Sequence, residues 1–524
     1  ATAPVIVNKN DGTTLFYREG LSDLSVSPTV LKGQEVSAAV ELTTDVNWSR
    51  LVERGGTLVR RSAQLRRWFA GQLFEEARIV VNGLTFDPVY GAVDDPLSVT
   101  IAQRRREFTR PLPDAKASVS SDTFPITGSY NLNLDMDGAV YPIIIGYPGI
   151  TATESAPQPA MPVIVAEGDF VSAIEPASLL VAGGHIEATE LQLWSLDEQS
   201  TTSDRVLNDV FTLNKTYDLL NNPITTISIS GTLAPAFSSE RLKQKYYTSI
   251  STNGMSTGGG LPNLTHSAPL RAAGDVIEYM LSTYSELPLD RGRMAAQRLY
   301  LNQVLIDTYI NSRVNAWEWL SRSVLPLLPV SEVETSEGIY FQFWRWDATT
   351  VDAIAHFDVQ LLQLERRSRV ETLSQNVVNE FEIRFQPSCT STSEYHASKV
   401  ITGQDDSSDS RVVVDYLCKL SQQVNSYGIR SEQVDAFPIW DTASAVRIGK
   451  WKAAQFALPK RMIRYNANSS LEAFQIGDIV TLSDSELSLS HTLCLIRELV
   501  ITATGCNLLL ILLDNPVLDS RLTT

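Results

Sequence analysis

The stretch of sequence that decides the fold is LEAFQIGDIVTLSDSELSLSHTLCLIRELVITATGCNLLLILLDNP, residues 471–516. Gly477 and the aspartate after it predict a tight turn that leads into a strand, IVTLS. Two further apolar runs, LIRELVI (495–501) and NLLLILL (507–513), predict strands that pair with it, and Gly505 predicts the turn between them. The stretch contains no recognisable cluster of nucleophile, base or metal ligands. It therefore predicts a regular β unit whose role is architectural.

The first strand of this unit has two faces, because successive side chains of a strand point to opposite sides. The alternation places Ile479, Thr481 and Ser483 on one face, and Val480 and Leu482 on the other. The apolar runs at 495–501 and 507–513 are the expected partners of this strand.

Length and charge limit the classes of protein to which the chain can belong. Its 524 residues predict roughly three or four domains of about 150 residues each. A hydrophobic fraction of 43% and a charged fraction of 20% are typical of an ordinary globular protein. The formal net charge of −17 argues against a main task of gripping nucleic acid, which needs a basic surface. An acidic composition alone does not indicate a function, because many proteins are acidic.

The cysteines indicate neither a disulfide scaffold nor a zinc site. The four thiols, at positions 389, 418, 494 and 506, form no CxxC pair, so buried reduced thiols are expected. The first residues lack the basic and apolar regions of a signal peptide, and no apolar stretch reaches the length of a membrane span. We therefore expect no membrane insertion by this chain.

The middle of the chain predicts helices. DVIEYMLSTYS (275–285) places apolar side chains on one helical face, and Asp290 predicts the N-cap of the next helix. NSRVNAWEWLSRSVLPLLPV (311–330) predicts a helix ended by its prolines. TASAVRIGKWKAAQF (442–456) predicts another helix between short strands. VNEFEIRFQP (378–387) alternates cleanly and predicts a strand.

The N-terminal half predicts strands and turns. Asn82-Gly83 is a two-residue turn signal that predicts a hairpin, and the sequence Asp94-Asp95-Pro96 is expected to precede a strand. Proline-rich turns between short β-type runs over 123–195 predict a small all-β insertion. The arginine run 104–106 is short, and in an acidic chain it favours a solvated strand end over a nucleic-acid patch.

Motifs of known chemistry are weak throughout the sequence. No two of the five histidines lie within ten residues of one another, so no metal-ligand spacing appears. One GxSxG match places Ser256 in the nucleophile slot, but GGLPN follows it, where the motif needs a helix. The pairs Asp135/Asp137 and Asp405/Asp406 are expected to be solvated turns, since LDMDG lacks the later ligands of a calcium loop. We predict no catalytic, cofactor-binding or metal-binding residue.

Four tryptophans, Trp317, Trp319, Trp344 and Trp346, allow two interpretations. They could form a platform that binds sugars, or they could pack in the core. Core packing is favoured, because Trp317 stands at helical spacing and GIYFQFWRWD (338–347) alternates like a strand.

The C-terminal third resembles the baseplate hub, or tail-tip, proteins of long-tailed bacteriophages and of related gene transfer agents. Three elements in order carry the resemblance: YGIRSEQVDAFPIWDTASAVRIGKWKAAQFALPKRMIRYNA (427–467), the GDIVTLSD motif with its flanks (471–484), and the paired apolar runs (495–516). VNGLTFDPVYGAVDDPLSVTI (81–101) and the β module with YPIIIGYPG (141–149) also fit such hubs.

The resemblance implies an α+β, β-rich fold. It implies two tail-tube-like β-barrel domains with flanking helices, a small inserted β domain and a further peripheral domain. The expected boundaries are 1–116 plus 201–265 for the first tube-like domain, 117–200 for the insertion, 266–375 for a helical or mixed segment, and 376–524 for the C-terminal tube-like domain.

The same resemblance implies a function and partners. The protein would be a structural virion protein without enzymatic activity, a homotrimer whose six tube-like domains match the hexameric tail tube above. Its implied neighbours are the distal tail protein and the tail tube, the tape measure protein, and tail fibres or a central spike. DNA would pass through the channel without specific binding, and an acidic wall would keep it from sticking. The expected location is the phage tail tip, after assembly in the host cytoplasm.

Other interpretations stay open on sequence alone. A receptor- or carbohydrate-binding tail protein would expose clustered tryptophans. A tail-associated cell-wall hydrolase would bring acidic residues, or Cys and His, together in a cleft. An unrelated β-rich virion or secretion-system component is a third possibility, because type VI spike proteins share the hub fold.

Overall fold

The computed structural model describes residues 270–513 apart from short gaps at 286–288, 336–337, 347, 361, 363, 367–370, 373–375, 390–393, 406–410, 426, 468–470, 472–473 and 502–505. Before residue 270 it describes strands and some of the turns beside them: 5–8, 14–17, 21–26, 37–42, 59, 61–67, 78–89, 97–102, 111–112, 117–124, 131–132, 136–149, 160–168, 178–183, 191–196, 203–206, 211–229 and 245–250.

Two antiparallel sheets come from the first 102 residues. β1 (Val5–Asn8) and β2 (Thr14–Tyr17) pair with each other. The second sheet has the order β3-β4-β7-β6-β5. Its strands are β3 (Leu21–Val26), β4 (Ser37–Leu42), β5 (Ser62–Arg67), β6 (Arg78–Val89) and β7 (Leu97–Ala102).

The prediction of a hairpin turn at Asn82-Gly83 is wrong. β6 runs straight through this pair, and Asn82 and Gly83 lie opposite Gln64 and Ala63 of β5. Beyond them the same strand pairs with β7. Neighbours on both sides of β6 stabilise the extended conformation more than the local turn preference favours a bend. The predicted strand after Pro96 is confirmed, since β7 begins at Leu97.

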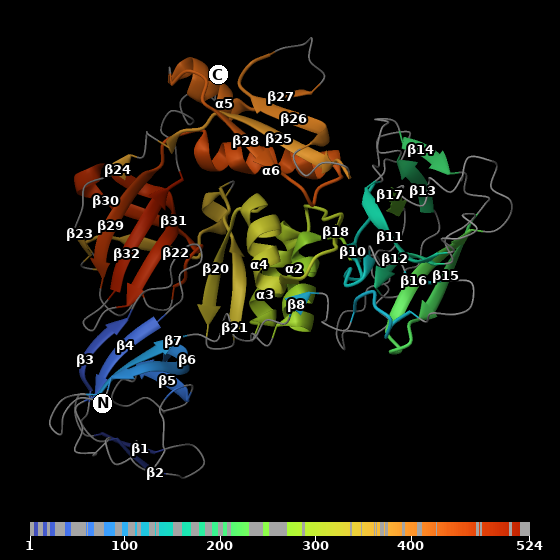
Figure 1. The fold of residues 1–524 in the computed structure, drawn as a ribbon. Helices are drawn as coiled ribbons and strands as arrows, with labels where there is room; N and C mark the ends of the chain where they lie inside the picture. Colours follow the sequence, from blue (N-terminus) through green and yellow to red (C-terminus); the bar gives the residue numbers. More distant parts are fainter. Residues whose placement is uncertain are drawn as a thin grey trace.

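An eight-stranded antiparallel sheet, here called the peripheral sheet, stands at one side of the molecule (Figure 1). Its order is β14-β13-β17-β11-β12-β16-β15, and β9 also pairs with β11. The strands are β9 (Asn131–Leu132), β11 (Met161–Gly168), β12 (Ser178–Gly183), β13 (Leu191–Leu196), β14 (Ser203–Val206), β15 (Phe211–Tyr217), β16 (Pro223–Ile229) and β17 (Lys245–Ile250).

The pairing in this sheet crosses an expected boundary. β14 to β17 fall within the expected first tube-like domain, yet β14, β16 and β17 hydrogen-bond with strands of the expected insertion, and β15 joins the same sheet through β16. Antiparallel neighbours that follow one another in the chain, such as β15 and β16, join easily through a short turn. The domain boundaries themselves stay a prediction.

The centre of the molecule is helical. It contains α2 (Ala273–Tyr284), α3 (Arg291–Leu301) and α4 (Ala316–Trp319), which continues as a π turn, η5 (Leu320–Val324), and a 3-10 turn, η6 (Leu325–Leu327). Two short pairs tie earlier segments to it: β10 (Ile143–Ile145) with β18 (Thr308–Ile310), and β8 (Pro111–Leu112) with β19 (Val314–Asn315).

The helix predictions for this region are largely confirmed. The apolar face of α2 is buried, and the Asp290 side chain accepts a hydrogen bond from the Arg293 backbone N–H as the N-cap of α3. The helix expected over 311–330 is shorter, because the Asn315 side chain caps it at Ala316 and the segment before the cap is strand.

A hairpin of β20 (Val330–Thr335) and β21 (Gly338–Phe343) lies between these helices and the C-terminal part. Five of the six β21 residues are buried, so both faces of this strand are covered. Phe341 stacks on Trp317, and Phe343 stacks on Tyr300 of α3. The hairpin is therefore internal to the fold.

A four-stranded mixed sheet with the order β27-β26-β25-β28 carries two helical segments. Its elements are β25 (Glu380–Pro387), β26 (Tyr395–Thr402), β27 (Val412–Val414), α5 (Tyr416–Lys419), the π turn η9 (Leu420–Val424), β28 (Ser431–Asp435) and α6 (Thr442–Phe456). The prediction of α6 is confirmed with the same bounds. α6 packs closely on β25 and β26, since a Cβ at Gly449 would lie 2.4 Å from an Ile401 side-chain carbon.

The last sheet has the order β22-β30-β31-β32-β29-β23, with β24 also paired to β29. Its strands are β22 (Ala355–Asp358), β23 (Glu365–Arg366), β24 (Glu371–Thr372), β29 (Arg461–Ala467), β30 (Ile479–Asp484), β31 (Leu489–Ile501) and β32 (Cys506–Leu512). The short helices η7 (Thr350–Asp352) and η11 (Ser485–Leu487) flank it.

The predicted architecture of the 471–516 stretch is confirmed where it is described. Gly477 has φ +92 at the turn into β30, and β30, β31 and β32 pair in succession. Ile479 belongs to the large core shared with the helices, whereas Val480 and Leu482 belong to a second core on the other face of the sheet. The turn expected at Gly505 lies outside the described residues.

The fold is β-rich with few helices, as expected from the sequence. None of the sheets formed by the described strands closes into a barrel. The two tube-like barrels stay a prediction. None of the described helices is long and apolar enough to cross a membrane.

Candidate functional site at the junction of three modules

The described residues do not bring together the side chains of a catalytic or metal site. No group of three or more His, Cys, Asp or Glu side chains there could hold a metal ion. The four cysteines are free, and three of them are buried. Burial raises the pKa of the Cys389 and Cys418 thiols to about 12. These thiols are therefore poor nucleophiles near neutral pH.

Two histidines that are distant in the sequence meet in space. His356 on β22 and His491 on β31 stack with ring centroids 4.2 Å apart, because both strands flank β30. A His356 ring nitrogen lies 2.9 Å from the Thr481 hydroxyl oxygen. Sequence spacing could not reveal this pair, since it depends on sheet order. Two exposed imidazoles are too few ligands for a metal site of the usual kind.

The remaining candidates from the sequence are dispersed. Asp137 is exposed in a turn, as expected. Asp405 is also exposed, and its carboxylate lies 3.3 Å from the Lys419 amine. Ser256, Asp135 and Asp406, like the arginine run, lie outside the described residues.

The tryptophans form no exposed platform. Trp319 and Trp344 are buried, and Trp317 and Trp346 pack against the same large core. The Trp344 indole N–H donates to the Ser331 hydroxyl at 2.8 Å. Core packing, the favoured interpretation, is confirmed for these four side chains.

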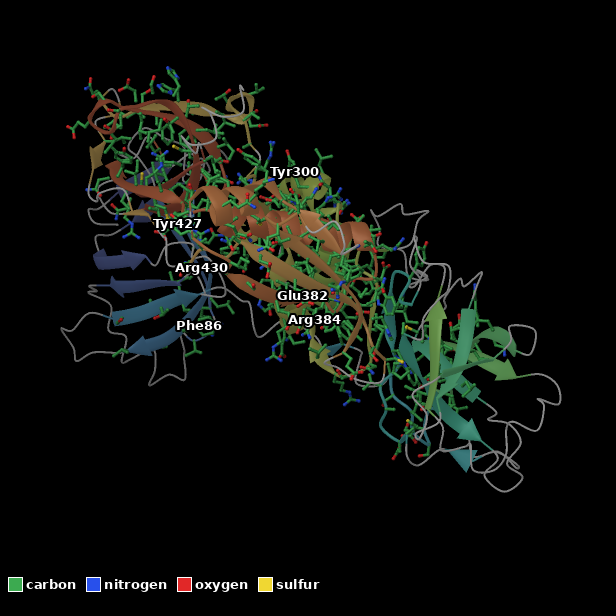
Figure 2. The ribbon with its side chains drawn as sticks, turned by 90° about the horizontal axis from the view of Figure 1, so that it is seen from above. Phe86, Tyr300, Glu382, Arg384, Tyr427 and Arg430 are labelled. Carbon is green, nitrogen blue, oxygen red and sulfur yellow. The ribbon has the colours of Figure 1, made fainter. Side chains whose placement is uncertain are left out.

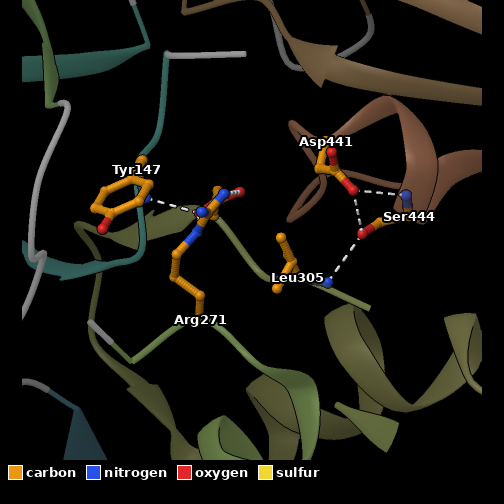
Figure 3. A network of polar contacts seen from close by, with 6 residues as sticks. Tyr147, Arg271, Leu305, Asp441 and Ser444 are labelled. Atoms are coloured by element: carbon orange, nitrogen blue, oxygen red, sulfur yellow. Dashed lines mark hydrogen bonds and ion pairs between the residues drawn. The ribbon is translucent and has the colours of Figure 1, made fainter. Parts of the chain in front are cut away.

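The most highly organised polar site joins separate parts of the fold. Residues 303–310, here called the junction segment, run between α2, the strand β10 and the start of α6 (Figure 3). The Ile306 N–H donates to the Arg271 carbonyl, and the Asp307 N–H donates to the Pro438 carbonyl at 2.8 Å. β10 in turn is tied to the peripheral sheet, where the Gly183 N–H donates to the Pro142 carbonyl at 2.8 Å. Three parts of the fold therefore meet at the junction segment: the peripheral sheet, the central helices, and the four-stranded sheet with α6. We call these parts the three modules.

Asp307 is the centre of this junction, and its side chain has no solvent exposure. Its Oδ1 accepts hydrogen bonds from Arg271 Nε and from the Tyr147 backbone N–H, both at 2.7 Å. Its Oδ2 accepts one from Arg271 Nη2 at 2.8 Å. The Arg271 guanidinium also lies over the Tyr147 ring, 4.2 Å from its centroid. A two-point contact of this kind fixes direction as well as distance.

Burial has the largest influence on both pKa values of this ion pair. It raises the pKa of the Asp307 carboxyl, against the opposing effect of Arg271 and the Tyr147 N–H. Burial alone would lower the pKa of Arg271, but the hydrogen bonds and charge of Asp307 outweigh it, and that pKa is raised. The guanidinium is therefore charged at any pH at which the protein is folded.

Gly146 is required by the geometry of the junction. It has φ +66, and a Cβ at this position would lie 2.1 Å from Asp307 Oδ1 and 2.5 Å from the Ile306 carbonyl oxygen. The chain can therefore bring the Tyr147 N–H to the carboxylate only where a side chain is missing.

The other side of the junction segment is anchored to α6. The Asp441 carboxylate caps this helix by accepting from both the backbone N–H and the hydroxyl of Ser444, each at 2.7 Å. Ser444 Oγ in turn accepts a hydrogen bond from the Leu305 N–H at 2.9 Å. Figure 3 draws both groups of contacts, the one at Tyr147 and Arg271 and the one that joins Leu305, Ser444 and Asp441.

Sequence reasoning did not single out Tyr147, Arg271, Asp307 or Ser444. Two weak signals exist in the sequence. Gly146 ends an apolar run, and Asp307 is an acid at the end of the apolar segment VLID (304–307). The polar atoms of this arrangement bond to one another and to the backbone. What it does is hold three modules in a fixed relation.

Comparisons with known proteins found similar solved structures but no similar sequence. No family model and no curated protein sequence matches this chain. A solved structure from the virion of a native gene transfer agent particle matches with a TM-score of 0.39 and 10% identity, over 65% of this chain and 78% of that chain. The tail protein from Neisseria meningitidis MC58 matches with a TM-score of 0.27 and 10% identity, over 62% of this chain and 91% of that chain.

A third match extends over nearly the whole length. The 43 kDa tail protein of prophage MuSo2 from Shewanella oneidensis has a TM-score of 0.30 and 8% identity, over 98% of both chains. The structure neighbours of this chain are thus phage and gene transfer agent tail and baseplate proteins.

Proposed function

We propose that this chain is a structural virion protein, the trimeric baseplate hub at the distal end of a phage tail. In this role it adapts the hexameric tail tube to the tip and lines the channel through which DNA leaves. The observation that carries the proposal is the regularity of the hub-like C-terminal third. The described residues of 427–513 form the long helix α6, the short turn η11 and a set of paired strands, with no possible metal site among them.

The domain plan follows from the same resemblance. We propose two tube-like units with flanking helices, the second of which is formed by 376–524. The strand pairing supports a larger insertion than the sequence indicated, one that extends from 117 to about 250 and includes the peripheral sheet. Residues 266–375 then form the helical or mixed segment, which also contributes β22, β23 and β24 to the last sheet, and the junction segment holds the insertion to it.

The open face of the four-stranded sheet supports an acidic channel lining. β25 and β28 run parallel, and polar side chains on this face pair across them: Glu382 accepts from the Gln433 amide at 2.9 Å, and Arg384 pairs with Asp435. Glu382 and Arg384 can be followed on the strand in Figure 2. With Glu380 beside Ser431, three carboxylates face one guanidinium. A face of this charge repels phosphate and lets DNA slide.

The proposed partners follow from the position of a hub. They are two further copies of this chain, the distal tail protein and tail tube above, the tape measure protein, and tail fibres or a central spike below. The proposed location is the virion tail tip, after assembly in the host cytoplasm. No glycan-binding role is proposed, because the tryptophans that suggested one are packed in the core.

Light scattering coupled to size-exclusion chromatography tests the proposal. The purified full chain is expected to have three times the 57.8 kDa mass of one chain, and electron microscopy of the same sample is expected to show rings with a central hole. A protein that stays monomeric at every concentration, or that cleaves cell-wall glycan, would contradict the hub assignment.

A further inference from the structure

The chain contains two helices that are built in the same way, one hundred residues apart. α4 begins after Asn315 and α5 begins after Asp415, and each has four α-helical residues followed by a five-residue π turn. In both, the cap side chain accepts from the N–H two residues later at 2.9 Å. The segments NAWEWLSRSV and DYLCKLSQQV also share leucine, serine and valine at the same places. We call them the first and second repeat.

The two repeats differ in what covers them. In the first repeat, Ala316 and Val324 are fully buried, and Val314 just before the cap packs against the large core. The matching positions of the second repeat are apolar but exposed: Val414 by 39%, Tyr416 by 46% and Val424 by 44%. Ile429, in the loop that follows, is 53% exposed. These four residues are here called the second-repeat surface.

The cover of the first repeat comes from the chain itself. β8 pairs with β19, so that the fully buried Leu112 lies opposite Val314, and α2 packs against α4. In the second repeat the matching strand β27 is an edge strand, which pairs only with β26 among the described strands. Figure 1 shows α4 within the central layer and α5 at the outer end of the molecule.

We propose that the second-repeat surface is the contact that this chain makes with a second copy of itself. In a ring of alternating, similar units, the same kind of contact occurs once inside each chain and once between chains. The first repeat makes this contact within the chain, where β8 and α2 cover it. The second repeat then presents the same positions, with apolar residues, to the neighbouring copy. This inference rests on the proposed hub and names the surface through which its copies meet.

The chemistry of the surface favours a protein over the other possible occupants. Four apolar residues are exposed within sixteen positions. Grouped exposed apolar side chains mark sites of contact with other molecules, and tyrosine is a residue type enriched in the hot spots of protein interfaces. An anionic membrane is disfavoured by a chain with a net charge of −17. The Lys419 amine nearby is already paired with Asp405. The surface therefore offers apolar area and a short strand edge that no described strand covers, and a folded copy can cover both.

The test uses the full chain with Tyr416→Glu and Val424→Lys combined. The acid stands at the start of α5 and the base at the end of η9, where each suits the helix ends, so folding is preserved. Leu299→Lys is the matched control, because Leu299 is 72% exposed near the end of α3, away from the second-repeat surface. Sedimentation velocity over a concentration series gives the dissociation constant of the assembly. Thermal melts of each variant check the fold.

The expected result is an assembly for the wild type and for Leu299→Lys, with a dissociation constant about tenfold or more higher for the double variant. Hydrogen exchange over 412–430 is expected to be slower in the assembled wild type than in the diluted one. Equal assembly of all three proteins would overturn the inference and leave the hub intact, because the copies then meet elsewhere. A monomeric wild type would overturn the hub itself, and the inference with it. Equal weakening by the control would also overturn the assignment to this surface.

Discussion

The guanidinium of Arg271 holds the carboxylate of Asp307 at two points, with N–O distances of 2.7 and 2.8 Å, where the aspartate has no contact with solvent. The pair lies where the junction segment meets β10 and α2. Removing one partner of such a pair leaves a charge without compensation in the interior, which costs more than the pair itself contributes.

Replacing Arg271 is therefore expected to be strongly destabilising. We expect Arg271→Leu to lower the free energy of unfolding by about 3–5 kcal/mol at neutral pH, with the loss read from urea denaturation. The pKa of Asp307 is raised by burial in the wild type, and loss of the guanidinium removes an influence that opposes this. A raised carboxyl pKa means that the folded state binds the proton more tightly. The destabilisation should shrink as the pH falls towards the ordinary range of a carboxyl and grow as the pH rises.

A double variant separates the charge from the packing. Arg271→Leu with Asp307→Asn has no charge to bury, so it is expected to recover part of the loss and to show little of this pH dependence. A single Arg271→Leu variant with wild-type stability, or a double variant that is worse than the sum of its parts, would show that the ion pair does not hold the junction.

Gly146 and Gly138 provide a test of the close approach at the same junction. Both have positive φ, +66 and +81, but a Cβ at Gly146 meets Asp307 Oδ1 at 2.1 Å, whereas one at Gly138 meets nothing within 4 Å. Gly138→Ala adds only the strain of an alanine at positive φ, so it should lower the free energy of unfolding by about 1 kcal/mol. We expect Gly146→Ala to cost several kcal/mol more, because the alanine methyl displaces the carboxylate. Equal melting temperatures for the two variants would contradict this account.

Asn379 is expected to be the most sensitive polar residue of the four-stranded sheet. Its side chain is fully buried and donates to the Ser421 hydroxyl and the Gly428 carbonyl, and it accepts from the Arg430 N–H, at 2.8 to 2.9 Å. Asn379→Ala leaves these groups without partners, so it should cost about 2–4 kcal/mol. Gln433→Ala, which removes one exposed amide bonded to Glu382, is the control and should change the unfolding free energy by less than about 1 kcal/mol.

The cysteines should be unreactive until the protein unfolds. Burial raises the pKa of Cys389 and Cys418 to about 12, so at pH 8 about one thiol in ten thousand is ionised. We expect Ellman's reagent to modify the folded protein slowly and all four thiols quickly in guanidinium. Raising the pH by one unit should increase the slow rate about tenfold, up to the point where the fold is lost. A thiol that reacts at once in the native protein would have to be ionised, against this prediction.

Local signals in the sequence predicted the elements well where pattern and packing agree. α6 has the predicted bounds, because Asp441 caps it and its apolar positions meet one sheet. Asp290 caps α3, and Gly477 makes the predicted turn. Where neighbours overrule local preference, the prediction failed, as at Asn82-Gly83 inside β6.

The candidate site could not be read from the sequence for a different reason. Tyr147, Arg271 and Asp307 come from three distant segments, and only sheet and helix placement brings them together. The stacked pair of His356 and His491 likewise depends on the order of β22, β30 and β31. The residue pattern within one segment cannot predict which residues of distant segments will be in contact.

The burial of β21 on both faces has a consequence for synthesis. One side of this hairpin is covered by helices made before it or just before it, but the other is covered by residues from Gln475 to Ile511, which leave the ribosome much later. The Tyr340 hydroxyl finds its acceptor on Gln475, and Gln342 lies against the Gly477 turn. A nascent chain that has passed residue 343 thus lacks the residues that cover Tyr340 and Gln342, and this side of the hairpin is exposed until the last strands are made. The second side of this internal hairpin is therefore completed only when the last strands of the chain have been made.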